Sequence, residues 1–393
     1  MTRPSEPHIL LSAGEASGDL HGATLCRALL ELAPDLRLRG MGGERMAAAG
    51  MELITDVSGH AVVGLSEALG RVPRLHRAYR QLRAEMLATR PAALVLIDFP
   101  EFNLWLARSA RRAGVPVVYF IPPQLWAWRR GRIRQVARRI RRVLAVLPFE
   151  TDLYRDSGVS VEFVGHPLLD VVPLDLTREE ARRRLGLDPG DVVIGLLPGS
   201  RREEVNRLLP SMLVAARRLS AAGIPARFAI GVAPTIDVGA IARMVKAAAA
   251  EGGPRVDVLE CRTYEVMAAA DVLLISSGTA TLEAALLGTP MVVCYRVSRF
   301  TELVVRIVAR VEWCSLPNLI AGRAVLPEVL QDELTAQRLT SEALRLLEDP
   351  LAATAQRAAF KEVRAKIGEP GVGRRAARAV LETAGLSLAE PGG

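Results

Sequence analysis

Two polar segments in the second half of the chain have the residue types of a phosphate-binding site. Ser277, Gly278 and Thr279 follow an apolar strand predicted over 272–275 and open a short helix that contains Glu283. Free backbone N–H groups in the first turn of a helix attract anions, and small residues leave room for a ligand to approach. This segment therefore predicts an anion site, and a strand–turn–helix packed only for structure is the alternative.

The second polar segment, Gly199-Ser200-Arg201, ends a strand predicted over 192–197. Ser200 and Glu203 have the spacing of a capping box, which places Arg201 at the first position of the following helix. A guanidinium beside a helix N-terminus suits a diphosphate, whereas the alternative is a capped surface helix with a solvated arginine. We favour the phosphate site because two strand ends in the same half of the chain show the same chemistry.

A candidate general base follows a strand in the first half of the chain. The strand predicted over 93–97 delivers Asp98 to its carboxyl end, where Phe99 and Phe102 are placed to enclose it. Apolar surroundings raise the pKa of a carboxyl group toward that of a useful base. Glu101 is a competing carboxylate, and a helix cap is the structural alternative for Asp98.

Three further loops supply candidate ligand contacts. The strand predicted over 8–13 passes through the turn 14–19 into a helix expected to begin near Leu20, without the glycine spacing of a dinucleotide site. A proline-rich loop after the strand predicted over 115–120 carries two tryptophans, which favours a ligand wall. Asn318, in a polar and irregular segment, could read a base edge or simply form a turn.

Strands and helices alternate through both halves of the chain, which is typical of parallel sheets covered by helices on both faces. A chain of 393 residues is too long for one compact core, and a proline-containing, charged stretch over 165–188 separates two sets of strands. We therefore predict an α/β fold with two doubly wound, Rossmann-like domains that face a cleft. The first covers residues 1–170 and the second 171–393, with the C-terminal helix packed back on the first as an alternative.

The amino-acid composition limits the kinds of molecule that the protein is expected to bind. Lys and Arg exceed Asp and Glu by 51 to 43, so the net charge is +8, which suits phosphates or an anionic membrane face. The arginine-rich run 129–142 is either a solvated helix face or a contact with anionic lipid or a phosphorylated substrate. Nucleic acid is disfavoured because aromatic residues do not alternate with the basic ones. No apolar run approaches the roughly 18 residues of a membrane span, so any membrane contact must be peripheral.

The four cysteines and five histidines are scattered through the chain. They show neither a disulfide framework nor the spacing of metal ligands, which predicts a reducing compartment and no metal site.

Taken in order, these segments resemble the lipid-A-disaccharide synthase family over nearly the whole chain. The matching motifs are AGEASGD (13–19), GMGGERMAAAG (40–50), LIDFPEFN (96–103), WAWR (126–129), LPFE (147–150), FVGHPLLD (163–170), LLPGSR (196–201), SSGTATLE (276–283) and SLPNLIAGR (315–323). Two positions depart from the family pattern, which often has Asp at Glu101 and Ser at Ile121. The first departure leaves Asp98 as the better candidate for the base, and the second affects the shape of the acceptor wall.

The resemblance implies a GT-B fold and an inverting transfer of 2,3-diacylglucosamine from UDP-2,3-diacylglucosamine to 2,3-diacylglucosamine 1-phosphate (lipid X). The products would be lipid A disaccharide 1-phosphate and UDP. It implies catalytic functions for Asp98, as base, and Arg201, toward the diphosphate; Glu283 would hold the ribose and Asn318 the uracil, with no metal or other cofactor. The donor candidates are Gly199, Ser200, Arg201, Ser277, Gly278, Thr279, Glu283 and Asn318. The acceptor candidates are Glu15, Ser17, Gly18, Asp19, Phe99, Trp126, Trp128 and Arg129.

The resemblance also implies a cytoplasmic enzyme, peripheral on the anionic inner leaflet of the inner membrane, and the family tendency toward dimers favours a homodimer. A UDP-sugar 2-epimerase is the rival prediction, since it shares the UDP cleft but takes no lipid acceptor. A non-catalytic sensor of nucleotide sugars is a third. Two segments that combine apolar and basic residues, 62–75 and 299–311, favour a lipid substrate over both, although core packing is the alternative for most of their residues.

Overall fold

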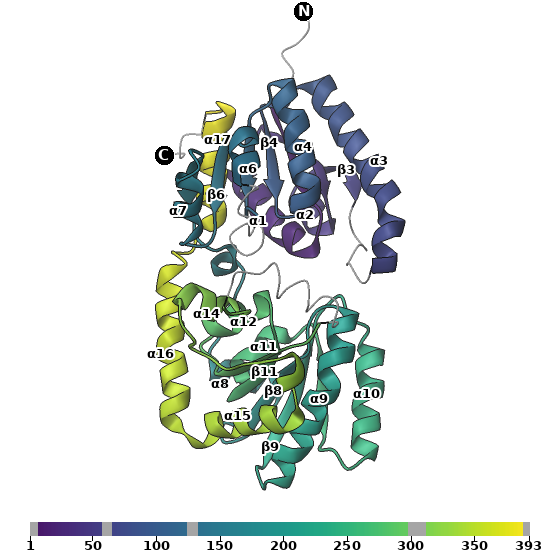
Figure 1. Ribbon diagram of the computed structural model, residues 1–393, viewed down its shortest axis with the longest axis vertical. Helices are drawn as coiled ribbons and strands as arrows, with labels where there is room; N and C mark the ends of the chain where they lie inside the picture. The colour runs from purple at the N-terminus through teal and green to yellow at the C-terminus, as the bar shows by residue number, and fades with distance from the viewer. Residues whose placement is uncertain (1–6, 57–64, 124–132, 298–311, 388–393) are drawn as a thin grey trace, which may run out of the picture. The chain divides into compact units, whose positions relative to one another are not determined.

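The computed structural model describes residues 7–56, 65–123, 133–297 and 312–387 (Figure 1). The chain forms two compact units. The first unit contains residues 1–170 together with 367–393, and the second unit contains residues 171–366. The predicted acceptor residues Trp126, Trp128 and Arg129 lie outside the described residues.

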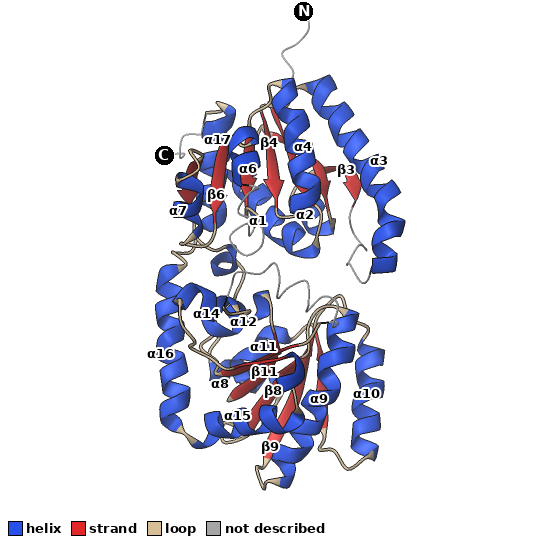
Figure 2. Cartoon of the chain, viewed as in Figure 1, coloured by secondary structure: helices blue, strands red, loops and turns tan. Residues whose placement is uncertain are grey.

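The first unit is built on a parallel sheet of seven described strands, in the order β3-β2-β1-β4-β5-β6-β7 (Figure 2). Six of the seven strands overlap segments whose sequence predicts a strand, at 8–13, 36–38, 93–97, 115–120, 142–147 and 162–164. The sequence does not predict β3, because it is a half-exposed edge strand with acidic residues at both ends. The strands are β1 (His8–Ala13), β2 (Arg37–Gly42), β3 (Glu52–Asp56), β4 (Ala93–Ile97), β5 (Val117–Phe120), β6 (Arg142–Ala145) and β7 (Ser160–Phe163).

Helices cover both faces of this sheet. Side chains of α3, α4, α6 and α7 share one apolar cluster with the sheet, and α17 packs beside α1 on the other face (Figures 1 and 2). The helices are α1 (Ala16–Leu32), α2 (Glu44–Ala48), α3 (Leu65–Thr89), α4 (Pro100–Ala113), α6 (Ile133–Arg139), α7 (Glu150–Arg155), the 3-10 helix η2 (Pro167–Asp170) and α17 (Val372–Ala384). Helix α1 begins at Ala16 rather than near Leu20, so Ser17, Gly18 and Asp19 belong to its first turn.

The second unit repeats this architecture with a parallel sheet of six described strands, in the order β10-β9-β8-β11-β12-β13. The strands are β8 (Val192–Leu197), β9 (Ala226–Val232), β10 (Val256–Glu260), β11 (Val272–Ser276), β12 (Met291–Tyr295) and β13 (Glu328–Leu330). The helices are α8 (Arg178–Leu185), α9 (Arg202–Ala221), α10 (Val238–Ala250), α11 (Thr263–Ala269), α12 (Thr279–Leu286), α14 (Leu316–Ala321), η3 (Gln331–Glu333), α15 (Ala336–Glu348) and α16 (Pro350–Lys366). The short strand β13 was not predicted, and α14 replaces the irregular loop expected around Asn318.

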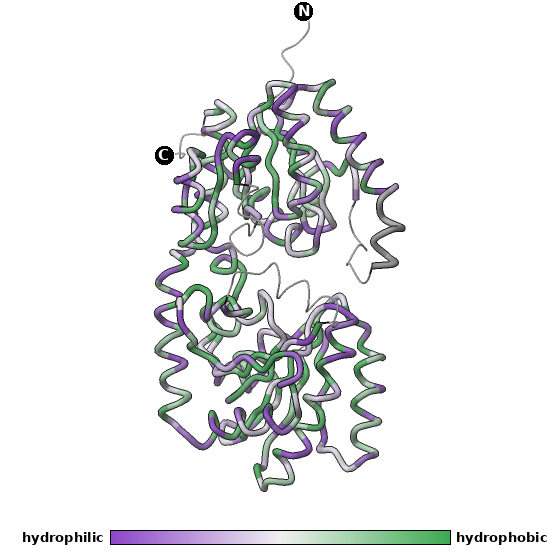
Figure 3. The backbone as a smooth tube through the Cα atoms, in the orientation of Figure 1, coloured by the Kyte–Doolittle hydropathy of each residue, from purple (hydrophilic) through white to green (hydrophobic). Residues whose placement is uncertain are grey.

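The central strands are largely apolar, as the hydropathy colours of Figure 3 show for β4. Every residue of β4 is buried, and so is every residue of β11, in which only the last residue, Ser276, is polar. Strands covered on both faces need such continuous apolar runs, whereas a strand with one wet face alternates. This pattern agrees with the parallel sheets that the alternation of strands and helices predicts.

Each sheet has a topological switch point, where the strand order reverses between two central neighbours. In the first unit β1 pairs with β4, and Ala13 lies beside Ile97, so the turn after β1 adjoins Asp98. In the second unit β8 pairs with β11, and Leu197 lies beside Ile275. The two candidate phosphate segments of the second unit therefore leave neighbouring strand ends, which is where doubly wound sheets bind ligands.

Two buried histidines lie close together in the first unit. His21 of α1 is 6% exposed and His166, before η2, is 7% exposed. Burial lowers the pKa of His21 to about 4, and burial with the nearby His21 lowers the pKa of His166 to about 3. His166 Nδ1 accepts a hydrogen bond from the backbone N–H of Leu168, whereas His21 Nδ1 has no partner among the described residues.

These lowered pKa values predict loss of stability in acid. An unfolded chain protonates its histidines below the ordinary pKa of 6.5, while the folded unit keeps His21 and His166 neutral until far lower pH. The stabilisation is therefore complete above pH 6.5 and is lost as the pH falls toward the folded values, by about 2 kcal/mol for one histidine near pH 5. Urea unfolding of His21→Leu should show a shallower loss between about pH 7 and 5 than the wild type. His76→Leu, at an exposed position of α3, serves as the control; equal slopes for His21→Leu and the wild type would contradict the prediction.

Candidate active site

The chain makes an unusual corner where β4 ends at the switch point of the first unit. Asp98 and Phe99 both have φ of +47°, a left-handed conformation that costs side-chain-bearing residues on the order of 1–3 kcal/mol each. The carbonyl oxygen of Asp98 accepts hydrogen bonds from the Tyr119 hydroxyl at 2.8 Å and from Asn103 Nδ2 at 2.7 Å. The corner turns the Asp98 side chain toward α1.

The carboxyl group of Asp98 is half-buried and lies 3.5 Å from Ser17 Oγ, which donates to it. Burial raises the pKa of Asp98, and hydrogen bonds from the backbone N–H of Phe99 and from Ser17 partly offset that rise. Glu101, the competing carboxylate, is exposed in the first turn of α4. Asp98 thus has both the position and the raised pKa of a general base.

The ring of Phe99 lies over the turn that follows β1. A Cβ atom at Gly14 would come within 2.1 Å of this ring, so only glycine fits beneath it. Phe99 also stacks on Phe102, with ring centroids 5.5 Å apart, and Phe102 is buried in the apolar core. Both rings border the Asp98 corner, on the apolar side that the sequence predicts.

The predicted acceptor residues of α1 differ in what they are free to contact. Asp19 is 8% exposed and its carboxylate accepts hydrogen bonds from the backbone N–H groups of Gly43, Arg45 and Met46, at 2.8, 3.2 and 3.1 Å. These bonds fix the start of α2, which gives Asp19 a structural function. Its contact with the acceptor stays a prediction. Gly18 is buried as well. Glu15 and Ser17 are half-buried at the start of the helix.

In the second unit, the strand end after β8 forms the predicted helix N-terminus one residue later than expected. The helix α9 has Arg201 as its N-cap, and Glu204 rather than Glu203 supplies the capping carboxylate. Glu204 Oε2 accepts from the backbone N–H groups of Ser200 and Arg201 at 3.2 and 3.3 Å, and Oε1 lies 2.7 Å from the Arg201 guanidinium. Gly199, at φ +116°, permits this approach, because a Cβ atom there would lie 2.5 Å from Glu204 Oε2.

The neighbouring strand end after β11 provides the second helix N-terminus. Gly278 and Thr279 are exposed at the start of α12, and Ser277 Oγ donates to the carbonyl of Cys314 at 2.9 Å. Glu283, half-buried one turn into the helix, accepts a hydrogen bond from the Tyr264 hydroxyl at 3.0 Å. Burial raises the pKa of Glu283, and this hydrogen bond partly offsets the rise.

Asn318, which the sequence predicts as a contact to the base, has all of its side-chain hydrogen-bonding groups paired within the protein. The residue is 1% exposed. Its side-chain oxygen accepts from the N–H groups of Val325 and Leu326, and its nitrogen donates to the Leu326 carbonyl and to Glu328 Oε1. In this arrangement the buried carboxamide shapes the loop around it.

Glu328 is the organising residue of this region, and sequence reasoning missed it. At the start of β13, its carboxylate accepts from Cys314 N, Ser315 N, Ser315 Oγ and Asn318 Nδ2, at 2.9, 2.9, 2.6 and 2.9 Å. Through Cys314 the same network reaches Ser277. Apart from its place in a short apolar stretch, nothing in the sequence marks this glutamate.

Both units thus carry chemistry at their switch points: a half-buried carboxylate in the first, and two helix N-termini with an arginine in the second. Together with two doubly wound parallel sheets, these features define a protein of the GT-B class. Similar solved structures are a putative UDP-N-acetylglucosamine 2-epimerase from Listeria monocytogenes (TM-score 0.66, 12% identity, 96% of each chain covered) and the glycotransferase of kitacinnamycin (TM-score 0.62, 18% identity, 97% of this chain and all of that one). At these identities they show the fold alone.

The sequence comparisons identify the family within this class. The lipid-A-disaccharide synthetase family matches residues 9–381. The lipid-A-disaccharide synthase of Geobacter sulfurreducens is 43% identical over 388 residues, which cover 99% of this chain and the whole of that protein. The chain belongs to the lipid-A-disaccharide synthase family and has this glycosyltransferase activity in lipid A biosynthesis. The rival prediction of a 2-epimerase matches at the level of the fold only.

The Glu328 network generates a test of stability. In the wild type, the backbone N–H of Cys314 donates to one carboxylate oxygen of Glu328. In Glu328→Gln an NH2 group replaces one of the two oxygens, so a donor faces a donor. We expect a loss of about 2 kcal/mol in the unfolding free energy. Urea unfolding measures this, with Glu362→Gln as the matched control, because its ion pair with Arg323 is more than half exposed on both sides and should contribute little. Equal losses in the two variants would contradict the proposed organising function of Glu328.

Proposed function

We propose that, in the synthase reaction, the first unit activates the acceptor and the second unit binds the donor. The substrates of a lipid-A-disaccharide synthase are UDP-diacylglucosamine and lipid X. Asp98 removes the proton from the 6-hydroxyl of lipid X, and the oxygen attacks the anomeric carbon of the donor from the face opposite UDP. The transfer inverts that carbon. The observation that carries this proposal is the half-buried carboxylate of Asp98, whose pKa is raised at a sheet switch point.

On the donor side, the N-termini of α9 and α12 and the Arg201 guanidinium stabilise the negative charge of the departing diphosphate. The backbone N–H groups of Ser200 and Arg201 contact the Glu204 carboxylate in this structure, so the diphosphate must take the place of Glu204 to use them. Glu283, held by Tyr264, accepts hydrogen bonds from the ribose hydroxyls. No function toward uracil is assigned to Asn318.

The base assignment predicts that Asp98→Asn loses turnover while donor binding is retained. We expect kcat to fall by roughly 10²- to 10⁴-fold, since the carboxamide cannot accept the proton. UDP release from UDP-diacylglucosamine and lipid X measures turnover, and calorimetry with UDP measures donor binding. Glu101→Gln is the matched control: full activity of that variant beside an inactive Asp98→Asn identifies the base. Normal turnover by Asp98→Asn would show the assignment to be wrong.

We further propose that the protein works as a peripheral protein at the cytoplasmic face of the inner membrane, with α3, α4 and α6 of the first unit toward the lipid. Their outer surfaces carry exposed arginines, and none of these is paired with a carboxylate within the described parts of the chain. The exposed arginines are Arg74, Arg77, Arg80, Arg83, Arg108, Arg111, Arg112, Arg134 and Arg138. Trp105 lies among them on α4 and is 67% exposed, and tryptophan with arginine is typical of membrane-surface contacts.

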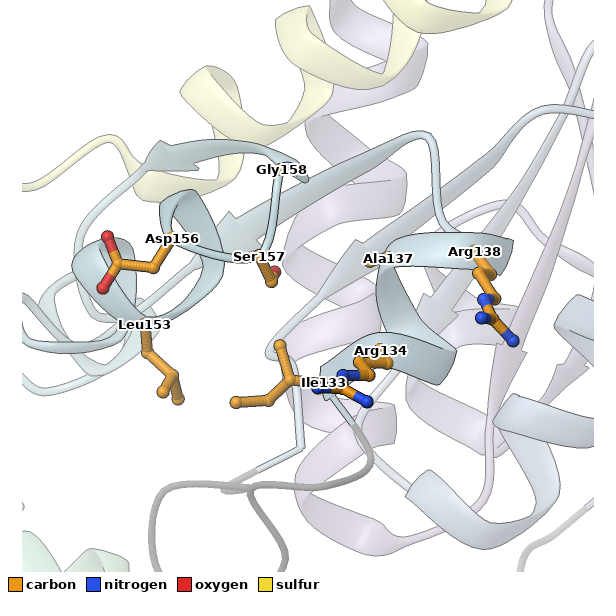
Figure 4. Close-up of a pocket in the computed structure, with 8 residues that line it drawn as sticks. All are labelled: Ile133, Arg134, Ala137, Arg138, Leu153, Asp156, Ser157 and Gly158. Carbon is orange, nitrogen blue, oxygen red and sulfur yellow. The ribbon is translucent and has the colours of Figure 1, made fainter.

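A groove of about 630 Å³ adds an apolar element to this surface. It lies between α6 and α7, where Ile133 and Leu153 point into it, and Arg134 and Arg138 belong to its lining (Figure 4). Apolar walls beside unpaired guanidinium groups suit a molecule with an anionic head and a carbon chain. No helix in the described ranges is long and apolar enough to cross a membrane. We also propose, on the family resemblance alone, that the protein forms a homodimer.

Charge reversal on this face should weaken binding to anionic vesicles. We expect Arg108→Glu with Arg112→Glu to lower the affinity for phosphatidylglycerol vesicles roughly tenfold or more, because each basic residue near an anionic surface contributes about 1 kcal/mol. Co-sedimentation at low salt measures the binding. The control reverses Arg217 and Arg218, which are exposed on α9 of the second unit. If both pairs lose the same affinity, binding follows net charge and the proposed face is wrong.

A further inference from the structure

We propose that Asn103 and Tyr119 are positioning residues for Asp98, which they hold through its backbone carbonyl rather than through its carboxylate. This inference rests on the proposed function of Asp98 as the base. Neither residue touches the reacting atoms. Their effect on the reaction is to fix the direction in which the Asp98 side chain leaves the strand.

The backbone at this corner needs an external restraint. Asp98 still follows the sheet, since its N–H donates to the Phe120 carbonyl at 3.4 Å, but its φ of +47° and the same φ at Phe99 turn the chain out of the strand. Two consecutive left-handed residues with side chains persist only where surrounding contacts determine them. A chain free to relax would return to negative φ and carry the carboxylate away from Ser17.

Asn103 provides the first restraint from within α4. The residue is completely buried, and Ser12 Oγ donates to its side-chain oxygen at 2.7 Å. Its Nδ2 lies 2.7 Å from the carbonyl oxygen of Asp98, against 3.2 Å for Ile97 and 3.3 Å for Ser12. A single carboxamide therefore ties the ends of β1 and β4 to the corner, and its shortest bond is the one to Asp98.

Tyr119 provides the second restraint from the neighbouring strand. It lies beside Leu96 in the pairing of β4 with β5, and its side chain is completely buried. The hydroxyl donates to the Asp98 carbonyl at 2.8 Å. Burial, with the nearby Asp98 as a smaller cause, raises the pKa of Tyr119 well above its ordinary value, so the hydroxyl keeps its proton and remains a donor at neutral pH.

The two donors reach one oxygen from different elements, and this geometry determines where the carbonyl of Asp98 points. Because a peptide carbonyl and the following residue are linked by a planar bond, fixing the carbonyl also fixes the N–H of Phe99, which contributes to the electrostatics of Asp98. Misplacement of a catalytic group by about 1 Å can cost a hundredfold in rate. A restraint on the backbone of the base is therefore a restraint on kcat.

Tyr119→Phe tests the proposal with the loss of a single hydroxyl. We expect kcat to fall roughly tenfold or more, with unchanged KM for UDP-diacylglucosamine and unchanged affinity for UDP. The matched control is Tyr79→Phe, which removes a hydroxyl 2.7 Å from Ser109 Oγ elsewhere in the same unit and should keep the wild-type kcat. Asn103→Ser, which shortens the other donor, should reproduce the split between kcat and KM. Thermal unfolding of all three variants shows that the compared proteins are folded.

The same substitution in the Asp98→Asn background separates positioning from general stability. If Tyr119 acts through the base, Tyr119→Phe lowers kcat in the wild type and has no further effect in Asp98→Asn, measured in single turnover. An equal fold-loss in both backgrounds, or a wild-type kcat for Tyr119→Phe beside an inactive Asp98→Asn, overturns the positioning function alone. Full turnover of Asp98→Asn overturns the base assignment itself and this inference with it.

Discussion

The parallel pairing of β1 with β4, and of β8 with β11, is the constraint on which the rest of the molecule depends. Where the strand order of a doubly wound sheet reverses, the connections leave two neighbouring strand ends in opposite directions and open a space between them. The first unit places a carboxylate at such a point and the second places two helix N-termini there. Hydrophobic strands joined by right-handed crossovers are sufficient to produce this geometry in each sheet. The residues that directly follow the central strands then determine the chemistry of the site.

Those residues are held by buried polar networks rather than by apolar packing. Asn103 in the first unit makes hydrogen bonds with the ends of β1 and β4 and donates to the Asp98 carbonyl. Glu328 in the second unit accepts several hydrogen bonds from the segment 314–318. A buried polar group that lacks its partners costs 1–3 kcal/mol, so each network favours one loop conformation over its alternatives. Neither residue is proposed to contact substrate. Asn103 binds the backbone of Asp98, and Glu328 is linked to Ser277 through Cys314. Apolar side chains could fill the same volume, but they could not select a single backbone path.

The sequence is sufficient for the fold because its main signal, continuous apolar runs bounded by small residues, is local. Strands β1, β4 and β8 have the boundaries that the apolar runs predict. Short, half-exposed strands such as β3 and β13 lack that signal, so they were missed. Individual polar residues are harder to predict, because a carboxylate or carboxamide takes whichever donor the tertiary structure brings to it. The sequence predicts Asp19 and Asn318 as ligand contacts, and in the structure both have hydrogen-bond partners within the protein. It also predicts Glu203 as the capping carboxylate of α9, whereas Glu204 forms the cap.

The Glu204 carboxylate on the backbone of Ser200 and Arg201 has a consequence for turnover. A carboxylate only three and four residues along the chain from the groups it contacts is present there at a high effective concentration, whatever the concentration of nucleotide in the cell. In the proposed donor site, this internal anion would neutralise the N–H groups and the guanidinium as soon as UDP left. The site would then exchange one anion for another and would not remain as a bare positive site. Tight binding of the product, the ordinary penalty of a strong phosphate site, would be reduced by a residue of the site itself.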